Sequence, residues 1–142
     1  MLNKDVNVSV LGRQYSINNT AGNDAVKTEC KGQYYIKNGK HYVLYEEVSD
    51  DGSVTKCRLK FDDTTLEHNK SGELTTRFFF EKGTKHQTAY TTPFGDFLMG
   101  IDTKEFEFNE SGAKINLHAV YDMEINDEFA SENEIIIEIT SI

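Results

Sequence analysis

Residues 30–61 read CKGQYYIKNGKHYVLYEEVSDDGSVTKCRLKF, and this stretch decides the fold. It holds three segments in which polar and apolar residues alternate, separated by the turns Asn38-Gly39 and Asp50-Asp51-Gly52. Alternation with a period of two is typical of β-strands with one buried face, and Asn-Gly between two such segments is a strong hairpin signal. The stretch therefore predicts three antiparallel strands joined by short turns.

The same turns predict how these strands pair, because residues opposite each other in a ladder share one face of the sheet. The predicted pairs on one face are Ile36 with His41, Tyr34 with Val43, Gly32 with Tyr45, Cys30 with Glu47, Glu47 with Thr55, Tyr45 with Cys57, Val43 with Leu59 and His41 with Phe61. A two-residue turn at Asp62-Asp63 adds Leu59 opposite Leu66 and Cys57 opposite His68. The other face then gathers Lys31, Glu46 and Lys56, and sets Arg58 opposite Glu67. These complementary charges support an outward orientation of that face.

Beyond residue 61 the chain continues as hairpins in series, with short segments rich in Val, Ile, Thr, Tyr and Phe between turns. The further turns are Lys70-Ser71-Gly72, Glu81-Lys82-Gly83, Thr92-Pro93-Phe94-Gly95 and Ser111-Gly112. The predicted strands are 4–18, 24–37, 40–49, 53–61, 64–69, 73–80, 84–91, 96–108, 113–125 and 133–141. A flat sheet of this size would expose two long edges, so we predict an all-β, closed, antiparallel up-and-down β-barrel of about ten strands.

The register of the second half is less determined. One choice of turn points Leu74, Thr76, Phe78 and Phe80 inward, with His86, Thr88 and Tyr90 opposite them. A two-residue Ser71-Gly72 turn would instead point Arg77 and Phe79 inward, and alternation alone leaves both open. The Ser111-Gly112 turn pairs Phe108 with Ile115 and Phe106 with Leu117. Since Phe97, Met99 and Ile101 are out of phase with Phe106, we expect a bulge or bend near residues 102–104.

Length and composition restrict the class of protein. A chain of 142 residues is one domain in size, so we predict a single domain spanning residues 1–142. The first ten residues, MLNKDVNVSV, hold no apolar signal segment, and no apolar run approaches the ~18 residues of a membrane helix. We expect a soluble, cytoplasmic protein with no membrane partner. The net charge of −9 repels phosphate backbones, which argues against nucleic acid, and the two cysteines, Cys30 and Cys57, are expected to be free thiols.

Four parts of the sequence resemble the YwiB-like family of small bacterial proteins: KGQYYIKNGKHYVLYEE at residues 31–47, a Ser-Gly turn, the Phe-rich strand that ends in EKG at residues 81–83, and AYTTPFGDF at residues 89–97. The resemblance covers nearly the whole chain. It implies a calycin-type, or lipocalin-like, β-barrel in a bacterial, cytoplasmic protein. The family is a domain of unknown function, so the resemblance implies no catalytic residues.

The predicted interior is more polar than a filled barrel requires. One interpretation is a wet cavity that binds a small amphipathic or aromatic ligand; the other is a core in which the polar side chains and a few waters satisfy one another. Under the first interpretation the cavity-lining residues are Tyr34, Tyr45, Glu47, Cys57, His68, Thr76, His86 and Tyr90. Binding of a small ligand is the function we expect, with no cofactor.

Catalysis and metal binding find little support in the sequence. Cys57 opposite His68 could form a thiolate–imidazole pair, but no oxyanion motif and no third orienting group accompany it, so we expect no enzyme. His41, His68 and His86 lie on different rows without the tight spacing of a metal site. We expect no bound metal.

The outer face offers an alternative function. Its apolar residues are Tyr35, Tyr42, Leu44 and Val48, on two neighbouring strands. They form either a patch for a protein partner or a homodimer, or a set of ordinary scattered surface residues. The runner-up function is therefore a non-enzymatic structural or regulatory interaction protein.

Overall fold

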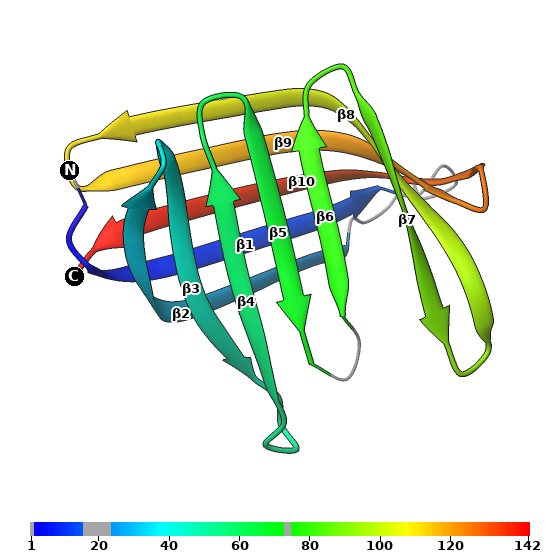
Figure 1. The fold of residues 1–142 in the computed structure, drawn as a ribbon, viewed down its shortest axis with the longest axis horizontal. Helices are drawn as coiled ribbons and strands as arrows, with labels where there is room; N and C mark the ends of the chain where they lie inside the picture. The colour runs from blue at the N-terminus through cyan, green and yellow to red at the C-terminus, as the bar shows by residue number, and fades with distance from the viewer. Residues whose placement is uncertain (1, 16–23, 73–74) are drawn as a thin grey trace.

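The computed structural model describes residues 2–15, 24–72 and 75–142, and these residues form ten β-strands (Figure 1). The strands are β1 (Asp5–Tyr15), β2 (Asp24–Lys37), β3 (Lys40–Val48), β4 (Val54–Phe61), β5 (Thr65–Ser71), β6 (Thr76–Glu81), β7 (Lys85–Thr92), β8 (Gly95–Ser111), β9 (Lys114–Ile125) and β10 (Glu128–Ser141). No helix among the described residues is long and apolar enough to cross a membrane. The prediction of an all-β, antiparallel up-and-down β-barrel is confirmed.

All ten strands belong to one sheet whose order is β6-β5-β4-β3-β2-β1-β10-β9-β8-β7. The first and last strands pair along ten residues, which joins the two ends of the chain and bends the sheet into a barrel. The remaining edges, β6 and β7, meet without a ladder and leave a seam. The expected pairing of His86, Thr88 and Tyr90 with β6 is therefore wrong: these residues pair with Ile101, Met99 and Phe97 of β8.

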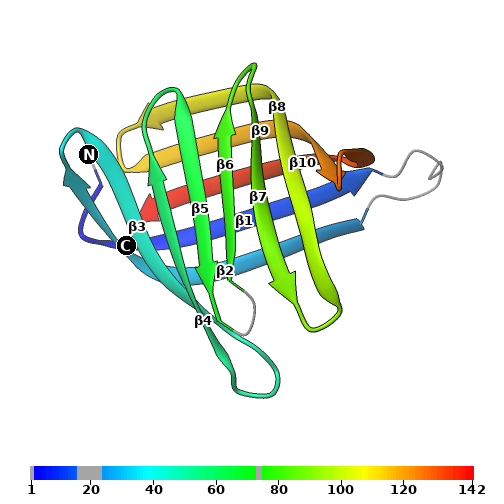
Figure 2. The same cartoon turned by 45° about the vertical axis from the view of Figure 1, so that its right-hand side comes forward.

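The barrel is flattened into two layers whose strands cross steeply (Figures 1 and 2). Two long strands, β2 and β8, pass from one layer to the other: β2 pairs with β1 over residues 24–33 and with β3 over residues 32–37. Gly32 lies at this corner, where a Cβ would come within 2.8 Å of the carbonyl oxygen of Leu44. On β8 the corner is an irregularity in the ladder between Thr103 and Glu105, which confirms the predicted bulge.

The hairpins of the quoted stretch have the predicted register, except that the predicted pair of Cys30 with Glu47 is wrong, because β2 leaves β3 at Gly32 and Cys30 faces Val8 of β1. Tyr34 faces Val43, and Tyr45 faces Cys57. Asn38 and Gly39 have φ angles of 54° and 77°, as a type I′ turn requires, and Gly52 has φ 86°. Both turns therefore fix the pairing through left-handed backbone that Asn and Gly adopt at little cost.

Two other hairpins are displaced by two residues from the prediction. The loop after β4 is longer than expected because Asp62 Oδ1 accepts hydrogen bonds from the amides of Thr64 and Thr65, so Phe61, and not Leu59, faces Leu66. Cys57 consequently faces Lys70, and Arg58 faces Asn69. Along β8 and β9, Phe108 faces Leu117 and Phe106 faces Ala119. A displacement of two keeps every side chain on its predicted face.

The orientation of β6 that alternation left open is settled. Phe80 is fully buried opposite Leu66, Phe78 faces buried His68, and Arg77 is exposed. Thr76, Phe78 and Phe80 therefore point inward, and Leu74 lies outside the described residues.

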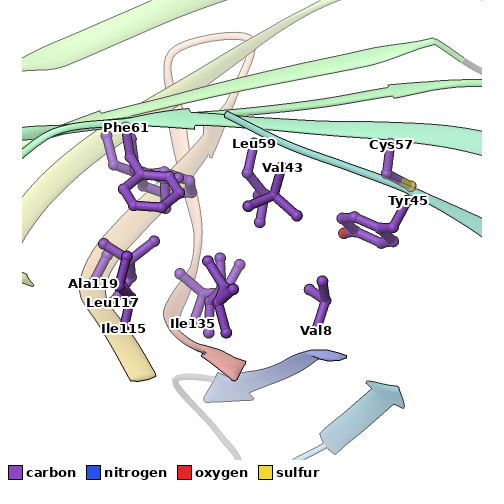
Figure 3. Close-up of a cluster of buried hydrophobic side chains, with 14 of the residues drawn as sticks. Val8, Val43, Tyr45, Cys57, Leu59, Phe61, Ile115, Leu117, Ala119 and Ile135 are labelled. Carbon is purple, nitrogen blue, oxygen red and sulfur yellow. The ribbon is translucent and has the colours of Figure 1, made fainter. Parts of the chain in front are cut away.

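The apolar core fills one end of the barrel, which we call the apolar end. It is the end that holds both chain termini, the turn 38–39 and the loop 62–65 (Figure 1). Side chains of β3 and β4, such as Val43, Leu59 and Phe61, face side chains of β1, β9 and β10 across the interior there (Figure 3). The fully buried residues include Val6, Val8, Val43, Leu59, Phe61, Leu66, Phe80, Ile115, Leu117, Ile137 and Ile139.

Candidate functional site

The opposite end of the interior, which we call the polar end, contains a partly enclosed cavity of about 320 Å³. It lies where β1, β9, β10 and the first part of β2 face β5 and β6. Its apolar wall consists of Val10, Val26, Phe78 and Ile135 beside Gly12, and its polar wall consists of Thr28, His68, Lys70, Thr76 and Tyr121. A mostly apolar lining with a few polar groups is typical of small-molecule sites, and this volume lies at the small end of their range.

The most buried polar residue of this wall is His68, whose Nε2 lies 2.9 Å from the hydroxyl of Tyr45. Burial and, less strongly, the charge of Lys70 lower the pKa of His68 to about 4, while the charge of Glu47 opposes the change. Burial also raises the pKa of Tyr45 well above its usual range, with contributions from Cys57 and Glu47. At neutral pH the pair is therefore an uncharged imidazole bonded to an uncharged phenol.

A charged pair lies next to this one. Lys70 Nζ is 2.9 Å from Oε1 of Glu47, and the thiol of Cys57 donates a hydrogen bond to the same carboxylate over 3.4 Å. Burial alone would raise the pKa of Glu47, but the hydrogen bond and charge of Lys70 outweigh it and lower the pKa. Burial, with the charge of Glu47, raises the pKa of the Cys57 thiol to about 12. Cys57 is thus protonated at neutral pH, which makes it a poor nucleophile.

Across the cavity lies Tyr121 with its neighbour Thr103, and the Thr103 hydroxyl is buried with no hydrogen-bond partner among the described residues. Tyr121, which lines the cavity, is only 7% exposed and its ring packs on Phe80. Its neighbour across the ladder, Thr103, is fully buried with Oγ1 unpaired. A buried hydroxyl without a partner costs about 1–3 kcal/mol, so the Thr103 hydroxyl lowers the stability of this end of the barrel.

The seam between β6 and β7 is closed by a side chain. The hydroxyl of Tyr90 accepts a hydrogen bond from the amide of Arg77 and donates one to the carbonyl of the same residue. Nearby, the ring of His86 packs on Phe79 at a centroid distance of 4.4 Å. Tyr90 and His86 thus hold the two edges together, whereas ladder hydrogen bonds join the other strand pairs.

The structure divides the eight predicted cavity residues among four places. Tyr45, Glu47, Cys57 and His68 form one cluster at the polar end, and of these only His68 lines the cavity, together with Thr76. Tyr90 and His86 lie at the seam. Tyr34 lies at the apolar end, where its hydroxyl is 2.6 Å from Nδ1 of His41.

The opposition of Cys57 and His68 is wrong, because His68 faces Leu59 across the ladder. The three histidines considered as metal ligands also lie apart: His41 at the apolar end, His68 at the polar end and His86 at the seam. Cys30 and Cys57 are free thiols, as expected.

Several cavity residues were missed by the sequence analysis. Lys70 could have been found, because it continues the inward alternation of Leu66 and His68 on β5. Tyr121 and Ile135 required the hairpin between β9 and β10. Its turn, Asn126-Asp127, has φ angles of 53° and 66° and is a type I′ signal that the prediction passed over.

On the outer face, Tyr35 and Tyr42 stack with their ring centroids 4.9 Å apart and their planes nearly parallel. Leu44 and Val48 lie on the same face, and Val54 of β4 faces Val48 across the ladder. All of these side chains are at least 40% exposed except Tyr42. The predicted outward orientation of this patch is therefore confirmed, although its use is untested.

Comparison with known proteins gives a consistent result. A family model described as "Domain of unknown function (DUF1934)" matches residues 9–137. The chain is 26% identical over 112 residues to the uncharacterized β-barrel protein YwiB of Bacillus subtilis (strain 168), covering 79% of this chain and 78% of that protein. The crystal structure of the B. subtilis ywiB protein matches 99% of this chain and 95% of its own, with a TM-score of 0.76 and 19% identity, which shows the likeness of fold. The chain belongs to the DUF1934 family of β-barrel proteins, whose function is unknown.

Proposed function

We propose that this protein binds a small molecule with an aromatic or amphipathic body in the cavity at the polar end of the barrel. The observation that carries the proposal is the cavity itself, whose lining places the apolar side chains of Val10, Phe78 and Ile135 beside the polar groups of His68 and Tyr121. A ligand with an apolar body and a polar group would satisfy both kinds of wall.

The fold supports this use of the interior. Barrels of about eight or more strands leave room for one small ligand, as lipocalin-like barrels do, and we include a lipocalin-like mode of binding in the proposal. Binding without catalysis is favoured because the thiol of Cys57 is protonated and hydrogen-bonded to Glu47. The two free cysteines support a reducing, cytoplasmic location.

The test uses Gly12, which lines the cavity and has no atom within 4 Å of where its Cβ would lie. Gly12→Leu should place a side chain in the cavity and block it while the fold is retained. With the neutral fluorophore N-phenyl-1-naphthylamine as probe, we expect binding by the parent and at least about a tenfold weaker affinity in Gly12→Leu.

Val54→Leu is the matched control, because it adds bulk at an exposed position on the outer face. A metabolite extract adds a second readout: a fraction that contains the natural ligand should raise the melting temperature of the parent and of Val54→Leu, but not of Gly12→Leu. Equal probe binding by the parent and Gly12→Leu, or no probe binding by the parent, would contradict the proposal.

A second candidate function is protein interaction through the outer patch of Tyr35, Tyr42, Leu44 and Val48. The specific observation that favours it is the stacked Tyr35–Tyr42 pair beside Leu44 and Val48, which are 40% and 70% exposed. If the protein self-associates through this patch, Tyr42→Glu should shift a dimer to monomer in size-exclusion chromatography with light scattering. A dimer that survives Tyr42→Glu uses another surface.

A further inference from the structure

A basic groove runs along the rim of the barrel beside the candidate site. This hollow of about 820 Å³ includes four cationic side chains in its lining, Lys56, Arg58, Lys70 and Arg77, and no Asp or Glu. The whole chain has 15 Lys and Arg against 24 Asp and Glu, so a lining with cations alone departs strongly from the composition. We call these four residues and the hollow between them the rim groove.

The cations of the rim groove are held in place by two carboxylates behind them. Glu67 lies 3.1 Å from Arg58 Nη2 and 3.6 Å from Arg77 Nε, and Glu47 pairs with Lys70. Lys56 forms no ion pair with a described residue. Four cations against two carboxylates leave an excess of positive charge, and the three ion pairs restrain Arg58, Arg77 and Lys70 before any ligand arrives.

The rim groove shares part of its lining with the cavity. Lys70 and Thr76 line both hollows, Lys70 at the end of β5 and Thr76 at the start of β6. On the cavity side of these two residues lie Phe78 and Ile135, and on the groove side lie Arg58 and Arg77. A single molecule could therefore extend from an apolar interior to a cationic rim.

We propose that the ligand of the barrel is an amphipathic anion, with its apolar body in the cavity and an anionic head, such as a carboxylate, sulfonate or phosphate monoester, in the rim groove. This inference rests on the proposed function, because it assumes an occupied cavity. The head group is an anion because the groove offers ammonium and guanidinium donors, with hydroxyl groups of Thr76 and Tyr90 beside them. A cationic head would meet repulsion at the same place.

Two probes with the same ring system separate this inference from the proposed function. N-phenyl-1-naphthylamine is neutral, and 8-anilinonaphthalene-1-sulfonate carries an anionic sulfonate on the same skeleton. We expect the parent to bind the anionic probe about tenfold more tightly than the neutral one. Added salt should lower the affinity for the anionic probe only.

The variant Lys56→Gln/Arg77→Gln removes two cations of the groove whose side chains are exposed to solvent. This variant should bind the anionic probe with about fivefold lower affinity, and its affinity for the neutral probe should stay within about twofold of the parent's. The matched control is Lys37→Gln/Lys114→Gln, which changes the net charge equally at the apolar end and should affect neither probe.

Each outcome decides a separate point. If both probes bind with equal affinity, or if the two double variants affect the anionic probe equally, the anionic head is wrong and the cavity function stands. If the parent binds neither probe, the proposed function fails and this inference fails with it.

Discussion

The two ends of this barrel are made by the same strands, but the inward side chains are apolar at one end and include polar groups at the other. On β4 the inward residues change from Phe61 and Leu59 at the apolar end to Cys57 at the polar end, and on β5 Leu66 is followed by His68 and Lys70. On β9, Leu117 and Ala119 give way to Tyr121. The apolar end is filled with side chains that need no partner, whereas the polar end holds groups that do.

The difference indicates which end of the barrel stabilises the fold and which end is available for binding. Buried hydrocarbon at the apolar end provides the free energy of folding, at about 25 cal/mol for each Å² removed from water. At the polar end, a cavity and the unpaired hydroxyl of Thr103 lower the stability that the same strands could reach. Departures from optimal packing of this kind are expected where a protein binds something. Four predictions follow from this comparison, in order of decreasing effect.

Loss of a core ring should be the most destabilising change. Phe61→Ala empties a fully buried position where the ring stacks on His41 at a centroid distance of 5.0 Å. We expect the free energy of unfolding to fall by about 3–5 kcal/mol in urea denaturation. Val54→Ala, at the exposed start of the same strand, should change it by less than about 0.5 kcal/mol. Similar losses in the two variants would contradict a stabilising core at the apolar end.

The second prediction concerns pH and the polar end. The pKa of His68 is about 4 in the folded protein against 6.5 for an unperturbed histidine, so protons bind preferentially to the unfolded chain. The stabilising contribution of neutral His68 is therefore complete above pH 6.5 and is lost as the pH falls toward 4. At about 1.4 kcal/mol for each pKa unit, the loss approaches about 3 kcal/mol.

The measurement is the difference in unfolding free energy between the parent and His68→Gln, from urea denaturation at several pH values. Carboxylates that titrate in the same range affect both proteins and cancel in this difference. The amount by which the unfolding free energy of the parent exceeds that of His68→Gln should decrease as the pH falls from 7 to 4. A difference that is independent of pH would show that folding leaves the pKa of His68 unchanged.

The third prediction tests the corner that lets one sheet make both ends. Gly32→Ala would place a Cβ 2.8 Å from the carbonyl oxygen of Leu44 and 3.1 Å from Val8 Cγ2, and should cost about 1–3 kcal/mol through local displacement. Gly12→Ala is the matched control, since nothing lies within 4 Å of its Cβ. It should leave the melting temperature unchanged or raise it slightly. A melting temperature for Gly32→Ala as high as that of the control would disprove the close approach.

The smallest effects should come from two tyrosines and should have opposite signs. Tyr45→Phe removes the hydrogen bond to His68 and should destabilise the protein by about 1 kcal/mol. Tyr121→Phe removes a hydroxyl without a partner among the described residues, so it should be neutral or stabilise by up to about 1 kcal/mol. Chemical denaturation at pH 7 resolves both. Equal destabilisation by the two changes would mean that the Tyr121 hydroxyl is satisfied, by water for example, and would weaken the case for a ligand.

Except on β6, where it left two orientations open, alternation predicted which face of the strand points inward even where the pairing was displaced. The displaced turn at Asp62 shows why: its side chain binds two following amides and lengthens the loop by two residues, which preserves the face but moves Cys57 from His68 to Lys70. The face of a side chain follows from local pattern. Its neighbour across the ladder depends on the loop, which the pattern does not specify.

The seam could not be predicted from local pattern, because a distant strand decides it. The amide of Gly83 donates to the carbonyl of Thr103, and the amide of Thr103 donates to the carbonyl of Thr84, so the bulged part of β8 binds the turn between β6 and β7. The candidate site was predicted in part for the same reason. His68 and Thr76 follow from alternation, whereas Tyr121 required the correct hairpin at Asn126-Asp127.

Because β6 and β7 form no ladder and the two termini lie next to each other, the same fold could be built with a different order of strands along the chain. The amide of Ile142 donates to the carbonyl of Asp5, so the two ends of the described chain lie side by side (Figure 1). A circular permutant that joins these ends and is cut at the turn after β6 would run from β7 through β10 and β1 to β6, in the spatial order of the sheet. Every ladder would then link consecutive strands. The β1–β10 ladder, which spans almost the whole natural chain, would become a local hairpin, and the contact order of the fold would fall.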